Sequence, residues 1–197
     1  MAKVCVFGGS GFLGSHVCDL LTEKGYEVVI FDNKPSPWLR KKQKMIVSDI
    51  LDLKEVHKAT KNTTHILNFA ALSDLNECLN KPIESANVNI IGNLNILEAC
   101  RENHIKKFIY ASSIYTLSHL GGFYRCSKQS AELYIQEYQR YYNLNYNILR
   151  FGSLYGPRSD SSNGVFRLVS NAIKNNFVTF KDDINTVRKF IHVKDAA

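Results

Sequence analysis

Short apolar runs alternate with amphipathic stretches between residues 3 and 151, and this alternation restricts the fold more than any other feature. The apolar runs have the length of buried strands, and the amphipathic stretches have the periodicity of helices. The pattern predicts strands at residues 3–7, 27–31, 44–47, 65–70, 107–111 and 146–151, and helices at 15–24, 52–59, 83–103 and 124–142. Strands connected by helices imply a parallel sheet covered on both faces, which is the doubly wound α/β class.

The composition excludes several other classes of protein. With 45% hydrophobic and 22% charged residues, the chain is expected to be globular. No apolar run approaches the roughly 20 residues that span a bilayer, and the start does not have the pattern of a signal peptide. The five cysteines are irregularly spaced without a Cys-x-x-Cys pair, so we expect reduced thiols and a cytoplasmic protein.

The net charge of +7 allows either a nucleic acid or an anionic small molecule as partner. The densest basic cluster, Arg40-Lys41-Lys42-Gln43-Lys44, lies between two predicted strands and has no nucleic-acid motif around it. We therefore expect a solvated loop there and no nucleic-acid partner. His192 and Asp195 are three residues apart, but no second ligand pair is visible, so no metal site is expected.

A glycine-rich segment, Gly8-Gly9-Ser10-Gly11-Phe12-Leu13-Gly14, connects the first predicted strand to the first helix. Glycines at positions 8, 11 and 14 allow a tight turn, a close approach of backbone to a pyrophosphate, and close packing of helix on sheet. Asp32 ends the second predicted strand, where a carboxylate binds the ribose hydroxyls of a dinucleotide. Its charge would repel a 2′-phosphate, so the sequence favours NAD over NADP.

Tyr124 and Lys128 are four residues apart at the start of a predicted helix, which places both side chains on one face. An ammonium beside a phenol favours the phenolate, so we expect the pKa of Tyr124 to be lowered. Such a tyrosine can take a proton from a substrate hydroxyl. The segment Tyr110-Ala111-Ser112-Ser113 ends the fifth strand at the carboxyl edge of the sheet, where ligands bind in such folds.

The Gly-x-x-Gly-x-x-Gly spacing, together with Tyr-x-x-x-Lys after the fifth strand, resembles the extended short-chain dehydrogenase/reductase superfamily. Within it the chain is similar to the NAD-dependent epimerase/dehydratase family, which acts on nucleotide sugars, and the resemblance extends over about residues 3 to 197. It implies that Tyr124 is the catalytic acid/base, that Lys128 assists it, and that Ser113 hydrogen-bonds the same substrate oxygen. Ser112 is the alternative for this serine.

The resemblance also implies the residues that bind NAD and substrate. In it, Asp49 and Ile50 lie beside the adenine, and Asn68 stands where the family often has His. The implied NAD-binding residues are Gly8, Gly11, Phe12, Leu13, Gly14, Asp32, Asn33, Asp49, Ile50, Phe69, Ala70, Ala71, Asn89 and Lys128. The implied substrate-binding residues are Ser153, Arg158 and Arg188, of which the last would contact the diphosphate.

The pattern of the chain changes after Phe151, where glycines, Pro157 and the polar cluster at 159–163 indicate irregular structure. A strand-like stretch follows at 189–193. The remaining residues are too few for an independent core. We therefore expect an NAD-binding Rossmann domain at residues 1–151 and the beginning of a substrate-binding lobe, truncated, at residues 152–197.

The resemblance separates several reactions by the residues that follow the catalytic serine. Ile114-Tyr115-Thr116 follows Ser113, so the Asp-Glu pair of 4,6-dehydratases is missing. This implies a nucleotide-sugar 4-epimerase, in which C4 is oxidised transiently and hydride returns without stereospecificity. The segment 114–123 is also shorter than is usual in the family, which bears on the choice of substrate.

Two alternatives stay open. One is a nucleotide-sugar 4-reductase or dehydratase of the same family, and the other is a non-catalytic NAD-binding regulatory module. The resemblance further implies a homodimer that pairs through the helices at 83–103 and 124–142, and a place in polysaccharide biosynthesis.

Overall fold

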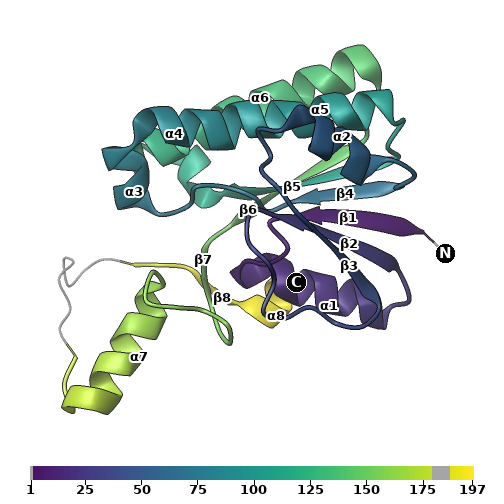
Figure 1. The fold of residues 1–197 in the computed structure, drawn as a ribbon. Helices are drawn as coiled ribbons and strands as arrows, with labels where there is room; N and C mark the ends of the chain where they lie inside the picture. The colour runs from purple at the N-terminus through teal and green to yellow at the C-terminus, as the bar shows by residue number, and fades with distance from the viewer. Residues whose placement is uncertain (1, 179–186) are drawn as a thin grey trace.

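The computed structural model describes residues 2–178 and 187–197. Six parallel strands form one sheet in the order β3-β2-β1-β4-β5-β6, which confirms the predicted doubly wound α/β class (Figure 1). These strands are β1 (Lys3–Phe7), β2 (Glu27–Asp32), β3 (Gln43–Val47), β4 (His65–Asn68), β5 (Lys107–Ser113) and β6 (Tyr146–Phe151). The six predicted strands are therefore all present.

Helices cover both faces of this sheet (Figure 1). On one face lie α2 (Leu53–Thr60), α5 (Gly92–Glu102) and α6 (Gly122–Tyr142); on the other lie α1 (Phe12–Glu23) and α8 (Val193–Ala196). The remaining elements are α3 (Leu75–Asn80), α4 (Pro82–Ala86), the π-helix η1 (Asn87–Ile91), the 3-10 helix η2 (Ile114–Leu117), α7 (Gly164–Asn175), and the paired strands β7 (Ser153–Tyr155) and β8 (Phe190–His192).

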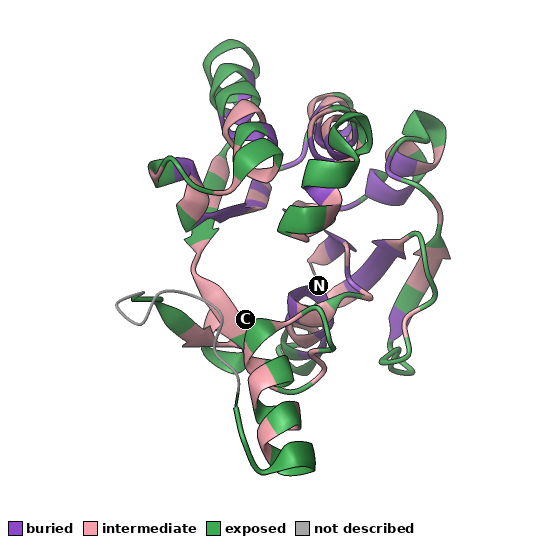
Figure 2. Ribbon diagram, turned by 90° about the vertical axis from the view of Figure 1, so that its left-hand side faces the viewer, coloured by how far each residue is buried: buried purple, intermediate pink, exposed green. Residues whose placement is uncertain are grey.

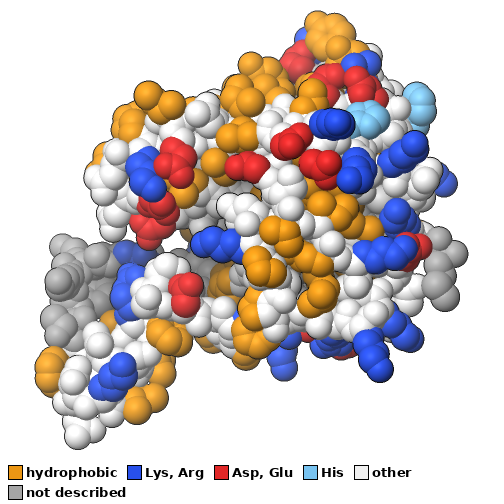
Figure 3. Space-filling view, in the orientation of Figure 1, with side chains coloured by type: hydrophobic (Ala, Val, Ile, Leu, Met, Phe, Trp, Pro, Cys, Tyr) orange, Lys and Arg blue, Asp and Glu red, His pale blue; other side chains and the backbone are white. Residues whose placement is uncertain are grey.

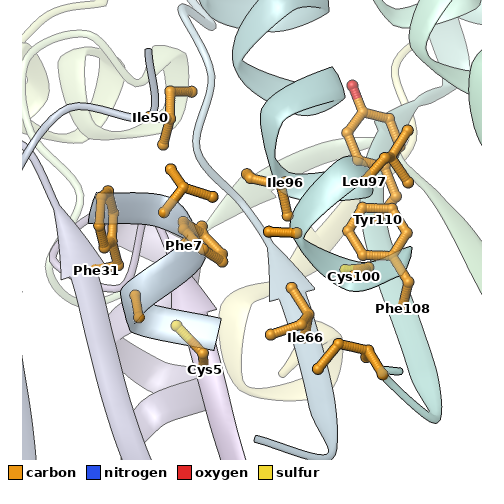
Figure 4. Packing of buried hydrophobic residues seen from close by; sticks show 14 of the residues in the cluster. Cys5, Phe7, Phe31, Ile50, Ile66, Ile96, Leu97, Cys100, Phe108 and Tyr110 are labelled. Carbon is orange, nitrogen blue, oxygen red and sulfur yellow. The ribbon is translucent and has the colours of Figure 1, made fainter. Parts of the chain in front are cut away.

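The core has two parts because successive residues of a strand point to opposite faces of the sheet. Phe7, Phe31 and Ile66 pack with Ile96 of α5 on one face (Figure 4). Val4, Val6, Val28 and Ile30 pack against α1 on the other face. Strands buried on both faces produce continuous apolar runs, and this explains why the sequence pattern predicted them so directly.

The helices α3 and α7 are among those not predicted, and each begins at a side-chain cap. The carboxylate of Asp74 accepts a hydrogen bond from the Glu77 N–H at the start of α3, at 2.9 Å. The amide oxygen of Asn163 accepts one from the Phe166 N–H at the start of α7, at 3.1 Å. The polar cluster at 159–163 therefore leads into a helix, so the expectation of irregular structure there holds only up to Asn163.

Helices α7 and α8, in the C-terminal part of the chain, differ in how far they are buried. No residue of α7 is buried, and Figure 2 shows this helix exposed or intermediate along its length. In contrast, α8 packs on α1, and Val193 is fully buried in the same cluster as Leu13 and Val17. The division at residue 151 stays a prediction, and residues 179–186 of the expected lobe lie outside the described residues.

Within the described ranges, no helix is both long enough and apolar enough to cross a membrane. On the face shown in Figure 3, Lys and Arg side chains are spread over the surface and interrupted by acidic and apolar side chains.

Candidate active site

The three glycines of the first loop bring three elements into close contact. A Cβ atom on Gly8, whose φ is +74°, would lie 2.5 Å from the Ala70 backbone nitrogen. A Cβ atom on Gly14 would lie 2.2 Å from the Gly8 carbonyl oxygen, and one on Gly11 would lie 3.3 Å from it. Side chains at these positions would separate α1 from the ends of β1 and β4. We call the loop of residues 8–14 the glycine cradle.

The glycine cradle presents the start of α1 at the carboxyl edge of the sheet. In the described structure, no side chain caps α1, and its first turn contains no acidic residue. The first N–H groups of a helix have no partner within it and carry partial positive charge, so this end suits a pyrophosphate. From β1 the strand order runs outward through β2 on one side and β4 on the other, and ligands bind at such a switch point.

Asp32, at the end of β2, borders the glycine cradle. Its two carboxylate oxygens accept hydrogen bonds from the Ser10 N–H at 3.0 Å and the Lys34 N–H at 3.3 Å. The side chain is half-buried, and the next residue, Asn33, is exposed. A carboxylate has about four acceptor positions, so two remain for ribose hydroxyls. The cradle and Asp32 together fit a dinucleotide such as NAD.

Five more of the predicted NAD-binding residues lie in or beside this cradle. Phe69 and Ala70, half-buried after β4, press on Gly8, and the half-buried Ala71 follows them. Phe12 is half-buried and Leu13 is buried at the start of α1.

Ile50, Asp49 and Asn89 are held by contacts within the protein. Ile50 is buried against Gly92, where a Cβ atom would lie 2.4 Å from the Ile50 side chain. Asp49 is exposed, and its carboxylate accepts the Leu51 N–H at 2.9 Å.

The buried Asn89 amide accepts the Leu72 N–H at 2.8 Å and donates to the Leu72 carbonyl and to the Ser127 hydroxyl. It therefore connects the loop after β4 to α6.

The structure brings Tyr124, Lys128 and Ser113 together. Tyr124 lies in the first turn of α6, Lys128 lies one turn later, and Ser113 is the last residue of β5. The Lys128 ammonium is buried and donates a hydrogen bond to the Ala111 carbonyl at 2.9 Å. It lies 5.7 Å from the centre of the Tyr124 ring and 4.6 Å from that of Tyr110.

The pKa of Tyr124 moves opposite to the sequence expectation. Burial raises it to about 12, the Cys78 thiol adds to the rise, and the Ser113 hydroxyl acts in the opposite direction. Burial also lowers the pKa of Lys128 to about 7, although Cys78 and Glu132 raise it. The expected lowering at Tyr124 is therefore wrong for this structure, because desolvation is the largest effect on the phenol and outweighs its hydrogen bond with Ser113.

The two candidate serines have different partners. The Ser112 hydroxyl donates to the buried carboxylate of Glu132. The Ser113 hydroxyl accepts the Tyr115 N–H at 3.3 Å and lies next to Tyr124. This arrangement favours Ser113 over Ser112 as the partner of Tyr124.

Cys78 is a neighbour of this site that sequence reasoning missed. Its thiol is fully buried on α3, donates to the Leu72 carbonyl at 3.4 Å, and interacts electrostatically with Lys128. No local signal identifies it, because α3 and α6 come together only in the tertiary structure.

The three predicted substrate-binding residues lie in the C-terminal part of the chain. Ser153 is half-buried on β7, and Arg188 is exposed just before β8. Arg158 forms a 2.6 Å ion pair with Asp19 of α1 and lies 4.6 Å over the Trp38 ring. Its charge is thus paired on the α1 face of the sheet, whereas Tyr124 belongs to α6 on the other face.

Within the described ranges, no group of three or more His, Cys, Asp or Glu side chains could hold a metal ion. His192 acts as the N-cap of α8, where its Nδ1 accepts the Lys194 N–H at 3.3 Å.

A comparison with models of protein families identifies the family of this chain. The model of the NAD dependent epimerase/dehydratase family matches residues 4–197. The chain belongs to the NAD-dependent epimerase/dehydratase family. This confirms the resemblance drawn from the glycine spacing and the Tyr–Lys pair. The family depends on NAD, and the glycine cradle fits this cofactor.

Members of this family with curated descriptions match almost the whole chain. A putative UDP-glucose 4-epimerase of Methanocaldococcus jannaschii is 31% identical over 219 residues, which cover 98% of this chain and 70% of that protein. Protein CapI of Staphylococcus aureus is 26% identical over 98% of this chain and 66% of its own length. The chain thus spans about two thirds of these family members.

Solved structures of this family show the same fold. The UDP-glucose 4-epimerase of Thermotoga maritima with UDP-glucose superposes with a TM-score of 0.92 at 29% identity, over 98% of this chain and 70% of that one. The UDP-glucose 4-epimerase of Thermus thermophilus in complex with NAD has a TM-score of 0.87 at 29% identity, over 98% and 71% of the two chains.

Proposed function

We propose that this family member catalyses the NAD-dependent 4-epimerisation of a UDP-sugar. The observation that carries the proposal is the placement of Tyr124, Lys128 and Ser113 in one group at the carboxyl edge of a sheet that also carries the glycine cradle. The relatives named as UDP-glucose 4-epimerases support the choice of reaction and of nucleotide.

In this proposal the chain's own residues hold the sugar and move one proton. Tyr124 takes the proton from the 4-hydroxyl group of the sugar, and Ser113 hydrogen-bonds the same oxygen. NAD, when bound, supplies the hydride acceptor and a positive charge on its oxidised ring. Since burial raises the pKa of Tyr124 to about 12, that charge and the Lys128 ammonium must favour the phenolate during the reaction.

The other functions are less well supported. A dehydratase needs acidic groups after the catalytic serine, and Tyr115 and Thr116 stand at these positions. A reductase would normally favour NADPH, which the Asp32 carboxylate disfavours. A purely NAD-binding module does not need both Tyr124 and Lys128, and both are present.

The test is to incubate the NAD-loaded chain with UDP-glucose, UDP-N-acetylglucosamine and UDP-glucuronate and to analyse the products by NMR. We expect interconversion at C4 without net oxidation of the sugar. A net reduced or dehydrated product would replace the epimerase by the corresponding alternative. Tight NAD binding without any product would favour the regulatory module.

Asp32→Ala is expected to weaken NAD binding by about 1.5–3 kcal/mol, the range for a hydrogen bond to a charged group. The loss of the carboxylate should also reduce the preference over NADP, because the repulsion of a 2′-phosphate disappears. Calorimetric titration of both dinucleotides measures this, and Asp195→Ala, an exposed carboxylate of α8, is the control. Equal affinities of the parent for NAD and NADP would contradict the role of Asp32.

We also propose a homodimer that pairs through α4, η1, α5 and α6. These helices expose several large apolar side chains, which a two-fold four-helix contact would cover. They are Ile83, Ile91, Leu133, Tyr134, Tyr141 and Tyr142.

Light scattering at tens of micromolar protein is expected to give the mass of a dimer. Leu133→Asp should shift it toward the monomer, whereas Leu117→Asp, an equally apolar exposed residue on η2, should not. A monomeric parent would contradict the proposal.

We further propose a cytoplasmic protein, in which the substrate-binding lobe begins after residue 151 and includes α7, whereas α8 packs back on α1. The five free cysteines, four of them buried, suit a reducing compartment. The exposed α7, which makes no buried contact with the sheet, suits a separate lobe. A role in polysaccharide biosynthesis would follow from a nucleotide-sugar product.

A further inference from the structure

Glu132 lies on the same face of α6 as Tyr124 and Lys128, because the three residues follow one another at intervals of four. Its side chain is buried, with 7% exposed. The carboxylate accepts hydrogen bonds from the Ser112 hydroxyl and from two nitrogens of Arg150, at 3.0 Å and 2.6 Å. The proposed reaction uses neither Glu132 nor Arg150 directly.

These contacts hold the end of β5 to successive turns of α6. Lys128 donates to the carbonyl of Ala111, and the next residue, Ser112, donates to Glu132. Arg150 is paired with Ser112 in the sheet, so one carboxylate connects α6, β5 and β6. Ser113 follows immediately, and its position relative to Tyr124 therefore depends on this connection.

Glu132 also differs in charge from the other groups that face Lys128. Those groups are Tyr124 on α6, Tyr110 on β5 and Cys78 on α3. Burial raises the pKa of each of these three, so they are neutral at neutral pH.

Burial would also raise the pKa of Glu132, but the hydrogen bonds from Arg150 and Ser112 outweigh it and hold this pKa below its usual value. Glu132 thus brings a negative charge to this group.

We propose that Glu132 is a positioning residue for this site: together with Arg150, it sets the place of Ser113 and supplies the charge that keeps Lys128 an ammonium. It acts through Ser112 and Lys128 and does not itself contact the substrate. The part of the inference that concerns turnover rests on the proposed function, whereas the charge state of Lys128 does not.

The experiment follows the titration of Lys128 directly, by NMR of the full chain labelled with ¹³C and ¹⁵N in lysine. The Lys128→Met variant identifies the resonance. The parent is expected to titrate near pH 7, in line with the lowered pKa. A nearby negative charge favours the ammonium. Glu132→Gln removes that charge, so the Lys128 midpoint should fall by about one pH unit.

Two further variants separate positioning from a general loss of structure. Arg150→Gln removes the compensating positive charge and leaves Glu132 in place, so the Lys128 midpoint should rise. Arg150 is partly exposed, so this variant also keeps the test valid if Glu132→Gln fails to fold. Glu137→Gln, from the exposed Glu137–Arg140 pair of the same helix, should leave the midpoint unchanged. Equal midpoints in the parent, Glu132→Gln and Arg150→Gln would overturn the inference, as would a shift of the same sign in both variants.

The pH profile of turnover distinguishes this inference from the proposed function. If the parent epimerises UDP-sugars, the alkaline limb of its kcat profile, where the Lys128 ammonium loses its proton, should move with the Lys128 midpoint, and Glu132→Asp should restore part of it. An unchanged profile in Glu132→Gln would overturn the positioning role and leave the epimerase intact. If no sugar reacts, but the Lys128 midpoint falls in Glu132→Gln and rises in Arg150→Gln, the proposed function fails and the charge assignment stands.

Discussion

Tyr124→Phe is expected to lower turnover by about 10²–10⁴-fold, the usual loss for a general acid/base, while NAD affinity stays within a few-fold. The substitution removes the phenolic oxygen and leaves the ring, so the packing of α6 against β5 is kept. The glycine cradle and Asp32 lie on other elements and are not altered. The measurement is single-turnover reduction of bound NAD by a UDP-sugar, with calorimetry for the affinity.

Three variants calibrate this prediction. Ser113→Ala should cost less than Tyr124→Phe, because it removes one hydrogen bond and no proton-transfer group. Lys128→Met should lower both turnover and NAD affinity, because the lysine is expected to reach the nicotinamide ribose as well as the phenol. Tyr26→Phe, an exposed tyrosine just before β2, is the control and should have no effect. If Tyr124→Phe reduced the cofactor as fast as the parent, the proton would leave by another route and the assigned site would be wrong.

Gly14→Val is expected to abolish measurable NAD binding and to destabilise the fold by about 3 kcal/mol or more, beyond the usual range for overpacking. A Cβ atom at this position would lie 2.2 Å from the Gly8 carbonyl oxygen and 2.9 Å from its carbon, both in backbone that cannot turn away as a side chain can. The helix would have to move off the sheet, and the N–H groups at its start would leave the glycine cradle.

Urea unfolding and NAD calorimetry measure both parts of this prediction. The control is Gly164→Ala at the start of the exposed α7, where a Cβ atom meets nothing closer than 4.0 Å. That variant should bind NAD normally and be at least as stable as the parent, since Ala favours a helix more than Gly. A Gly14→Val protein that binds NAD with the affinity of the parent would contradict the packing role of Gly14.

Local pattern was enough to predict the six strands, the long helices and the glycine cradle. The helix predicted at 83–103 is continuous, but it contains the π-helix η1, and this irregular turn carries Asn89. The helix predicted at 52–59 begins at Asp52, whose carboxylate caps α2 by accepting the Glu55 N–H at 3.1 Å. The short α3 was missed because six residues are too few to show a helical period. The exposed α7 does have such a period, with Val165, Leu168, Val169 and Ala172 at helical spacing, so the expectation of irregular structure was wrong there.

The charges of the site could not be predicted in the same way. The sequence places Lys128 one helical turn from Tyr124, and spacing alone predicts a lowered tyrosine pKa. The structure buries Lys128 and half-buries Tyr124, and desolvation is then the larger effect, so the shift has the opposite sign. Arg158 provides a second example, because its partner Asp19 is 139 residues away in the sequence.

The sequence by itself determined the doubly wound fold, the family and the three residues proposed for catalysis, since each is recorded in a short pattern of side chains with a fixed period or spacing. The tertiary structure alone decided which groups are desolvated and which charges face each other. It placed Cys78 of α3 beside the Tyr–Lys pair and joined Glu132 to Ser112 and Arg150 of two neighbouring strands. Desolvation and pairing depend on every element packed around a group, and no short stretch of the chain contains that information.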